Sequence, residues 1–243
     1  MTPLNTLQAV MRVAPMTRWI IIANVLFFAI MSFLPGLRQA MSLMPGYGFM
    51  QLIESGNLLY MLSAALSLVT YAFAHADIFH LLSNMLFFFL LAPPVEITLG
   101  SRRFLHFYLM LSVLSGLAFL VFTASPTPGT VVFDESGMAT PVMMIGASGA
   151  VMGVMAAFLV FWPRAVMLEL FALKVRALYV IGLYALGQVH SYLSGSIAAE
   201  TFWLHLAGFV SGAVVSFIIK ERKLLPIAQL YGEDADSPTE EKE

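Results

Sequence analysis

A few hydrogen-bonding side chains stand inside long apolar runs, where such groups are costly and are candidates for function. Ser148, His205 and His80 each lie 15 or 16 residues before a charged residue near the end of their run. At a rise of about 1.5 Å per residue, all three would lie at a similar depth, roughly 22–24 Å from that end. Because a histidine base makes a serine hydroxyl nucleophilic, we expect Ser148 and His205 to form a catalytic dyad for acyl transfer.

Acyl transfer also requires hydrogen-bond donors for the developing oxyanion. His80 and Asn84 are four residues apart and share one face of a helix, so an imidazole N–H and a carboxamide NH₂ can point at the same place. Backbone N–H groups near Gly146 and Ser148, at the start of a helix, would add donors and the positive end of the helix dipole. We therefore expect His80, Asn84 and Gly146 to form the oxyanion site. No Asp or Glu lies at this depth to complete a triad.

Small residues predict which helices touch. Gly149 and Gly153, and likewise Gly208 and Gly212, form small-xxx-small pairs that let helix backbones approach closely. His205, Gly208 and Gly212 have the spacing i, i+3 and i+7 and therefore lie on one helical face. That face would bring the imidazole to the serine of the glycine-lined helix. Taken singly, the serine and the glycines are equally typical of ordinary helix packing.

The composition indicates where these groups are held. Of the 243 residues, 60% are hydrophobic and 11% are charged, whereas a soluble domain carries about 25% charged residues. The sequence therefore predicts an all-α polytopic membrane protein with six transmembrane helices. The run 61–74 is too short to cross a bilayer, so we expect 35–74 to form a long first outer loop with interfacial pieces. The six runs that approach the required length of about 20 residues are 19–34, 78–92, 104–122, 143–162, 178–193 and 202–219.

The basic residues predict the orientation. With the N-terminus in the cytoplasm, every Lys and Arg except Arg38 falls on the inner side, as the positive-inside rule requires. We expect both termini to be cytoplasmic and the active site to open to the outer side. The chain divides into a short cytoplasmic N-terminus (1–18), a six-span membrane domain (19–220) and an acidic cytoplasmic tail (221–243) whose composition predicts disorder.

Several classes of function are excluded or disfavoured. The chain has no cysteine, so it has no disulfide and no thiolate nucleophile. No basic patch is interleaved with exposed aromatic residues, so we expect no nucleic-acid partner. A channel or transporter that relays protons would need polar residues through the whole membrane thickness, whereas these cluster in one outer layer. The absence of a transit peptide favours a bacterial cytoplasmic membrane.

The residues above resemble those of the rhomboid intramembrane serine proteases. The matching segments are 75–85 (HADIFHLLSNM), Glu96 with 99–101 (LGS), 146–149 (GASG), and 205–208 (HLAG) with Gly212. The resemblance covers about residues 19–220. It implies hydrolysis of a peptide bond in or near a transmembrane segment of a membrane-protein substrate, single-span or polytopic, without a metal or cofactor. It also implies that Ser148 is the nucleophile and His205 the general base.

The resemblance assigns further roles and shows departures. It implies that His80 and Asn84 stabilise the oxyanion, and that His75 and Glu96 are structural. The position four residues after the serine, often aromatic in the family, is Met152, and the position before the last histidine, commonly Ala, is Leu204.

Two further points come from the sequence. The alternative function is a catalytically weak or inactive rhomboid-like protein that binds transmembrane clients; such relatives usually lack the serine or the histidine, and both are present here. Asp77 is expected to cap the helix that carries His80.

Overall fold

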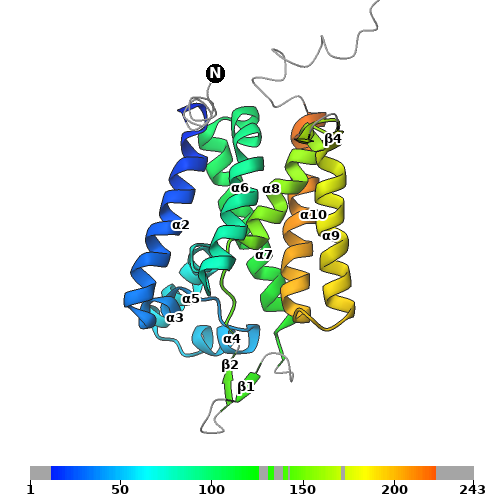
Figure 1. Ribbon diagram of the computed structural model, residues 1–243. Helices are drawn as coiled ribbons and strands as arrows, with labels where there is room; N and C mark the ends of the chain where they lie inside the picture. The colour runs from blue at the N-terminus through cyan, green and yellow to red at the C-terminus, as the bar shows by residue number, and fades with distance from the viewer. Residues whose placement is uncertain (1–11, 126–130, 134–138, 142, 171–172, 223–243) are drawn as a thin grey trace, which may run out of the picture.

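The computed structural model describes residues 12–125, 131–133, 139–141, 143–170 and 173–222, and most of these form helices (Figure 1). The predicted acidic tail from residue 223 onward and residues 1–11 lie outside the described residues. Among the described residues, four helices are long and apolar enough to cross a membrane. The prediction of a helical membrane protein is therefore confirmed, whereas the count of six crossings stays a prediction. The four helices are α2 (Pro15–Phe33), α6 (Ile78–Leu99), α7 (Ser101–Phe122) and α10 (Ala199–Glu221).

Two shorter helices complete the bundle. α8 (Ser148–Phe161) has 14 residues and α9 (Ala177–Leu193) has 17. Figure 1 shows α8 between α6 and α10, with α9 on the far side of α10. α8 is buried along almost its whole length, whereas only Ala177 and Ile181 of α9 are buried. α8 is therefore the central helix of the bundle, and α9 is a peripheral one.

The connection between α2 and α6 is largely helical. It contains α3 (Pro35–Met41), α4 (Gly46–Glu54), α5 (Leu58–Thr70) and a 3₁₀ turn, η1 (Tyr71–Phe73). At 1.5 Å per residue, α5 is about 20 Å long, which is less than the roughly 30 Å of a hydrocarbon core. The connection as a whole lies at the end of the bundle opposite the start of α2 (Figure 1).

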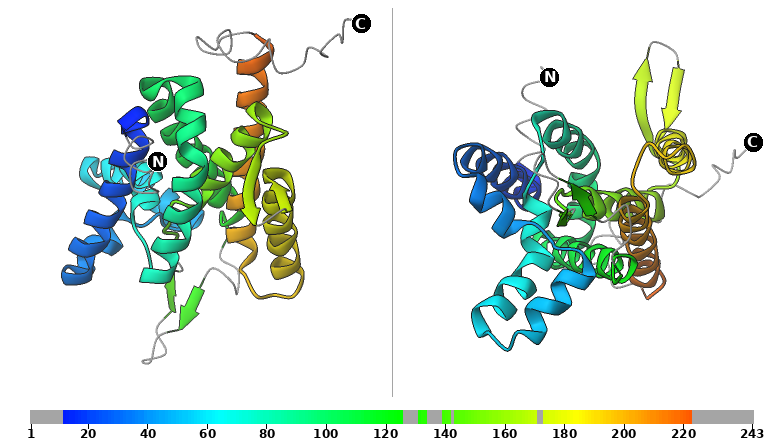
Figure 2. Two further views of the ribbon diagram at one scale, coloured as in Figure 1. Left: turned by 45° about the horizontal axis from the view of Figure 1, so that its top comes forward. Right: turned by 90° about the horizontal axis from the view of Figure 1, so that it is seen from below.

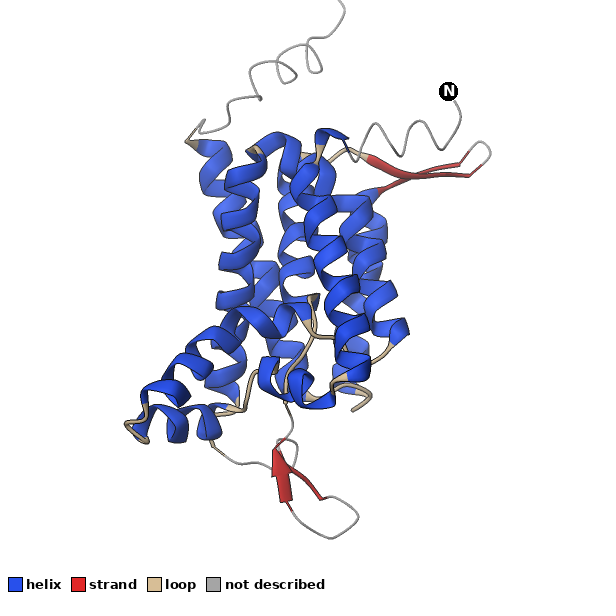
Figure 3. Cartoon of the chain, turned by 90° about the vertical axis from the view of Figure 1, so that its left-hand side faces the viewer, coloured by secondary structure: helices blue, strands red, loops and turns tan. Residues whose placement is uncertain are grey.

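Two short β-hairpins lie outside the helices, and the sequence analysis did not anticipate them. β1 (Val131–Phe133) pairs with β2 (Ala139–Pro141), and β3 (Val166–Leu170) pairs with β4 (Leu173–Arg176). Figure 3 shows the two hairpins at opposite ends of the bundle. Strands of three to five residues give no apolar run of the length that marks a transmembrane helix, so the search for such runs passes over them.

Glu96 joins three helix ends. Its carboxylate, 1% exposed, accepts hydrogen bonds from the backbone N–H groups of Met16 (2.8 Å) and Thr17 (2.6 Å), and from the hydroxyls of Thr17 (2.7 Å) and Ser101 (2.6 Å). Met16 and Thr17 belong to the first turn of α2, whose N–H groups have no carbonyl partner within the helix. One carboxylate near the end of α6 thus caps α2 and holds the first residue of α7.

α8 and α10 are in direct backbone contact. A Cβ atom built on Gly208 would overlap the carbonyl oxygen of Gly149, and one on Gly212 would overlap that of Gly153. In the reverse direction, a Cβ on Gly153 would lie 2.8 Å from the Gly208 oxygen. The two helices lie side by side over much of their length (Figures 1 and 2). No side chain larger than hydrogen fits at these positions without separating the helices.

Stacked aromatic rings join the ends of α7, α9 and α10. Tyr192 of α9 stacks on Phe202 of α10 with ring centroids 4.5 Å apart and planes inclined by 12°. Trp203 stacks on Phe122 of α7 at 4.6 Å and 7°. Such ring pairs contribute about 0.5–1.5 kcal/mol beyond their buried area. They fix the end of α9 next to α10, although only two residues of α9 are buried.

The glycine contact gives a stability prediction. Gly208→Ala should lower the free energy of unfolding by about 1–3 kcal/mol, because the added methyl group must push α10 away from α8. Gly182→Ala in α9 is the matched control, since a Cβ there meets nothing within 4 Å. Thermal unfolding in detergent micelles measures both variants. Equal unfolding midpoints would contradict the close contact between α8 and α10.

Candidate active site

Ser148 and His205 come together although 57 residues separate them in the chain. Ser148 is the first residue of α8, and His205 lies in the second turn of α10. The hydroxyl oxygen Oγ of Ser148 lies 2.7 Å from Nε2 of His205, which is hydrogen-bond distance. His205 is buried and Ser148 is half-buried. The geometry is that of a hydroxyl whose proton an adjacent imidazole can accept.

α8 begins at Ser148, as expected of a helix that starts near Gly146 and Ser148, and is therefore shorter than the apolar run 143–162. Gly146 has φ of +130°, a backbone conformation that ends any helix and suits only glycine. Before it, Met144 pairs with Leu43 in an antiparallel bridge, with N···O distances of 2.8 and 2.9 Å. The sequence pattern records the apolar character of this segment but not its extended backbone. Ser148 is therefore at a helix start inside the bundle.

The segment before Ser148 is held by the α2–α6 connection. The Gly146 N–H donates to the carbonyl oxygen of Tyr71 at 2.9 Å. Tyr71 is itself fixed, because its hydroxyl donates to the Ser112 carbonyl at 2.8 Å in a buried position. The sequence analysis missed Tyr71 as a support of the site, since a tyrosine in an apolar stretch carries no distinctive signal.

His80 lies against Gly146. A Cβ atom on Gly146 would lie 2.8 Å from both Cε1 and Nε2 of His80 and 3.7 Å from Oγ of Ser148. The absence of a side chain at Gly146 therefore lets the imidazole edge come close to the serine hydroxyl. The predicted cap at Asp77 is confirmed: its carboxylate accepts from the His80 N–H at 2.9 Å and starts α6 there.

The ring of His75 packs against the ring of His80. The two rings are 5.1 Å apart and inclined by 70°, an edge-to-face arrangement. Burial, together with the neighbouring His80, lowers the pKa of His75 to about 4, so this ring is neutral. Within the described part of the chain, no three His, Asp or Glu side chains gather in a group that could hold a metal ion.

The two other expected oxyanion residues have other contacts. One N–H of the Asn84 carboxamide donates to the carbonyl oxygen of His80 at 2.8 Å. The Gly146 N–H already donates to the carbonyl oxygen of Tyr71. Gly146 therefore provides space for the His80 ring but no free hydrogen-bond donor. The Ser148 N–H, in the first turn of α8, has no carbonyl partner within its own helix. Of the expected donors, His80 and the start of α8 are thus the ones that lie next to Ser148.

Gln188 is a site residue that the sequence analysis did not name. Its carboxamide oxygen Oε1 lies 2.9 Å from Nδ1 of His205, on the side of the ring opposite Ser148. Gln188 belongs to α9, so the imidazole bridges α8 and α9. The signal was present, because Gln188 is an uncharged polar side chain inside the fifth apolar run.

The two departures from the family pattern are both buried. Leu204 is fully buried in a cluster with Leu43, Tyr71, Phe119 and Met144. It therefore packs against the residues that hold the segment before Ser148, and this cluster accommodates the side chain that is larger than Ala. Met152 is 5% exposed in the main apolar core.

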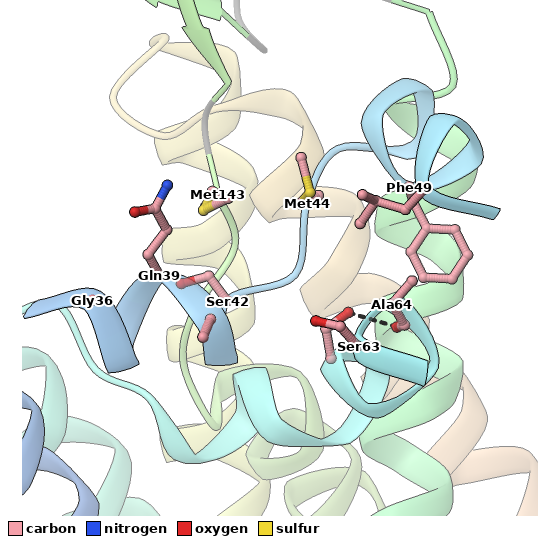
Figure 4. A pocket seen from close by; sticks show the side chains of 11 residues that line it. Gly36, Gln39, Ser42, Met44, Phe49, Ser63, Ala64 and Met143 are labelled. Atoms are coloured by element: carbon pink, nitrogen blue, oxygen red, sulfur yellow. Dashed lines mark hydrogen bonds between the residues drawn. The ribbon is translucent and has the colours of Figure 1, made fainter. Parts of the chain in front are cut away.

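A cavity of about 380 Å³ lies near the site but outside it. It is enclosed by α3, α4 and α5 and by Met143, and its lining mixes apolar groups with Gln39, Ser42 and Ser63 (Figure 4). Neither Ser148 nor His205 lines it. It is therefore a separate hollow beside the segment that leads to Ser148.

Comparisons with known proteins agree on one family. The sequence matches the family described as Rhomboid domain over residues 63–222. RHOMBOID-like protein 12, mitochondrial, from Arabidopsis thaliana is 28% identical over 159 residues, which are 61% of this chain and 44% of that protein. The chain thus spans less than half the length of this relative. The range 63–222 includes α6 to α10 and therefore all of the side chains around Ser148.

Gly146 gives a test of the site geometry. Gly146→Ala should lower the rate at which a serine-directed fluorophosphonate labels Ser148 by at least about tenfold, because the methyl group displaces His80 and strains the backbone by about 1–2 kcal/mol. Gly195→Ala is the matched control, since Gly195 also has positive φ (+70°) but has nothing within 4 Å of a Cβ. Equal labelling of the two variants would show that His80 does not depend on Gly146.

Proposed function

The chain belongs to the rhomboid family, and on that premise we propose that it is a serine-type intramembrane endopeptidase. Ser148 is the nucleophile and His205 the general base. The observation that carries this proposal is the 2.7 Å contact between Ser148 Oγ and His205 Nε2. The direct backbone contact of α8 and α10 supports the proposal, because it fixes Ser148 and His205 relative to each other.

The first half of the reaction forms an acyl-enzyme. Nε2 of His205 takes the hydroxyl proton of Ser148 as Oγ attacks the carbonyl carbon of the scissile peptide bond. The negative charge that develops on the carbonyl oxygen is stabilised by the imidazole N–H of His80 and the N–H of Ser148, with Asn84 adjoining them. The tetrahedral intermediate collapses when the imidazolium donates its proton to the leaving amine.

The second half of the reaction returns the enzyme to its starting state. A water molecule gives a proton to His205 and attacks the acyl carbon, and the ester bond to Ser148 breaks as its Oγ regains the proton. Water reaches this depth only through a polar opening, and Ser148 is half-buried, whereas His205 is 8% exposed. We place that opening on the outer side of the membrane.

The membrane arrangement that we propose has six crossings. α8 is about 21 Å long, and the non-helical residues 143–146 add at most about 3.3 Å each, so the two together can span the roughly 30 Å of the hydrocarbon core. Extended backbone is tolerated at this depth where it is buried and hydrogen-bonded within the protein, as the bonds to Leu43 and Tyr71 provide. α9 is about 25 Å long and needs only slight thinning of the bilayer.

The domain division and location follow from this arrangement. Residues 19–220 form the membrane domain, between a cytoplasmic segment (1–18) and a cytoplasmic tail (221–243). The α6–α7 junction, the β3–β4 hairpin and the end of α10 lie at the same end of the bundle as the start of α2 (Figure 1), and this end carries most of the basic residues. We assign that end to the cytoplasm and the protein to a bacterial cytoplasmic membrane.

The substrate class follows from the position of the dyad. A serine below the membrane surface acts on peptide bonds in or near transmembrane segments of single-span or polytopic proteins, which enter from the lipid. A helical substrate exposes a scissile carbonyl only where its helix unwinds, so helix-destabilising residues in the substrate favour cleavage.

Reconstitution with a transmembrane substrate tests the function. The unaltered protein should cleave it, whereas Ser148→Ala and His205→Ala should each lower kcat/KM by at least about 10³-fold, since nucleophile and base act as one unit. A fluorophosphonate should label Ser148, and His205→Ala should suppress the labelling. His190→Ala, an exposed histidine at the end of α9, is the control and should retain activity.

The same experiment separates the alternative function. An inactive rhomboid-like protein that binds transmembrane clients would retain the substrate without cleaving it and would leave Ser148 unlabelled. Cleavage that persists in both the serine and the histidine variants would disprove the dyad.

The absence of cysteine makes the orientation testable. Ser55→Cys and Ser194→Cys, at exposed positions in the connections opposite the start of α2, should react with a membrane-impermeant maleimide in intact cells. Arg222→Cys, at the end of α10, should react only after the membrane is opened. The reverse pattern would invert the proposed orientation.

A further inference from the structure

His205 has a second hydrogen-bond partner besides Ser148. Its Nδ1 atom faces the carboxamide oxygen of Gln188 at 2.9 Å, and its Nε2 atom faces Oγ of Ser148 at 2.7 Å. Both ring nitrogens are therefore engaged, each by a different helix.

The identity of the Gln188 atom determines the state of the imidazole. A carboxamide oxygen only accepts hydrogen bonds, so the proton of a neutral His205 must lie on Nδ1. Nε2 then carries the lone pair and faces the serine hydroxyl. This is the tautomer that a general base for Ser148 requires, and the opposite tautomer would direct an N–H at the hydroxyl.

The position of Gln188 is itself fixed by packing. Gln188 and Tyr192 are four residues apart in α9 and share the face that meets α10. Tyr192 stacks on Phe202, and Phe202 is three residues before His205 in α10. Tyr192 and Gln188 of α9 thus contact Phe202 and His205 of α10, respectively. The aromatic stack therefore fixes the position along α10 at which Gln188 meets the imidazole.

A neutral amide suits this depth better than a carboxylate. An ionised carboxylate inside a membrane is costly, whereas an amide supplies an acceptor oxygen without a charge. The sequence has no Asp or Glu near this position of α9.

We propose that Gln188 is a positioning residue for His205, and that the catalytic unit is Ser148–His205–Gln188. Gln188 holds the Nδ1–H tautomer and the ring orientation, and it hydrogen-bonds the imidazolium that forms when Nε2 takes the serine proton. It does not contact the substrate. The inference rests on the proposed proteolytic function.

Two replacements of similar length test the role. Gln188→Met removes the acceptor and should lower kcat about 10- to 100-fold with KM changed less than about twofold, because the loss affects proton transfer and not substrate binding. Gln188→Glu keeps an acceptor oxygen and should restore most of kcat. The glutamate should also move the acidic limb of the kcat–pH profile to higher pH, since an ionised carboxylate stabilises the imidazolium. Leu186→Met, at an exposed position on the same helix, should leave kcat and the profile unchanged.

A spectroscopic readout separates this inference from the proposed function. In ¹⁵N NMR of the detergent-solubilised protein, His205 should show the Nδ1–H tautomer, and Gln188→Met should shift it toward a mixture of tautomers. This measurement reports the contact even in a protein that cleaves nothing. An unchanged tautomer together with an unchanged kcat in Gln188→Met would overturn the inference, as would a glutamate variant as impaired as the methionine variant.

Discussion

The direct backbone contact between α8 and α10 is the constraint on which the rest of the structure depends. In lipid, apolar helices gain little from burying apolar side chains against each other, so close packing of small residues must hold them together. Gly149 and Gly153 meet Gly208 and Gly212 with no side chain between the two backbones. Ser148 and His205 lie at the same end of this contact, and therefore the 2.7 Å distance between Oγ and Nε2 follows from the helix packing. A nucleophile and a base on longer or more mobile supports would have to lose conformational entropy to reach this geometry.

A second constraint follows from placing the serine at the start of a helix inside the bundle. The start of a helix offers free N–H groups to an oxyanion, but it requires non-helical backbone before it, and such backbone is costly in a membrane unless it is hydrogen-bonded. The bridge from Met144 to Leu43 and the bond from Gly146 to Tyr71 meet that requirement. The α2–α6 connection therefore has a structural task at the site, and Leu204 packs against the same residues. At the other end of the bundle, the Glu96 carboxylate accepts hydrogen bonds from backbone N–H groups in the first turn of α2, which have no partner within their own helix.

The sequence was most informative where the physical requirement was strict. Apolar runs predicted the long helices because a bilayer demands about 20 apolar residues, and Asp77 was recognisable as a cap because few residue types can serve. The start of α8 near Gly146 and Ser148 was expected, but the extended backbone before it was not predictable, because hydrophobicity does not distinguish an extended buried segment from a helical one, and only the φ of Gly146 reveals the break. The Gly146 N–H donates to the carbonyl oxygen of Tyr71, far away in the chain, and the Asn84 carboxamide donates to the His80 carbonyl one helical turn before it. Both acceptors are backbone atoms, for which side-chain types give no signal.

The three members of the proposed catalytic unit are held with different rigidity. α8 and α10 touch through their backbones, so their separation cannot change without breaking the core of the bundle. α9 has only two buried residues and is fixed to α10 through the stacking of Tyr192 on Phe202. A displacement of α9 would therefore separate Gln188 from Nδ1 and leave the distance from Nε2 to Ser148 unchanged. The nucleophile and base would stay in contact while the tautomer of the base became free to change. In the proposed catalytic unit, α9 would thus set the tautomer of His205, whereas α8 and α10 set its distance from Ser148.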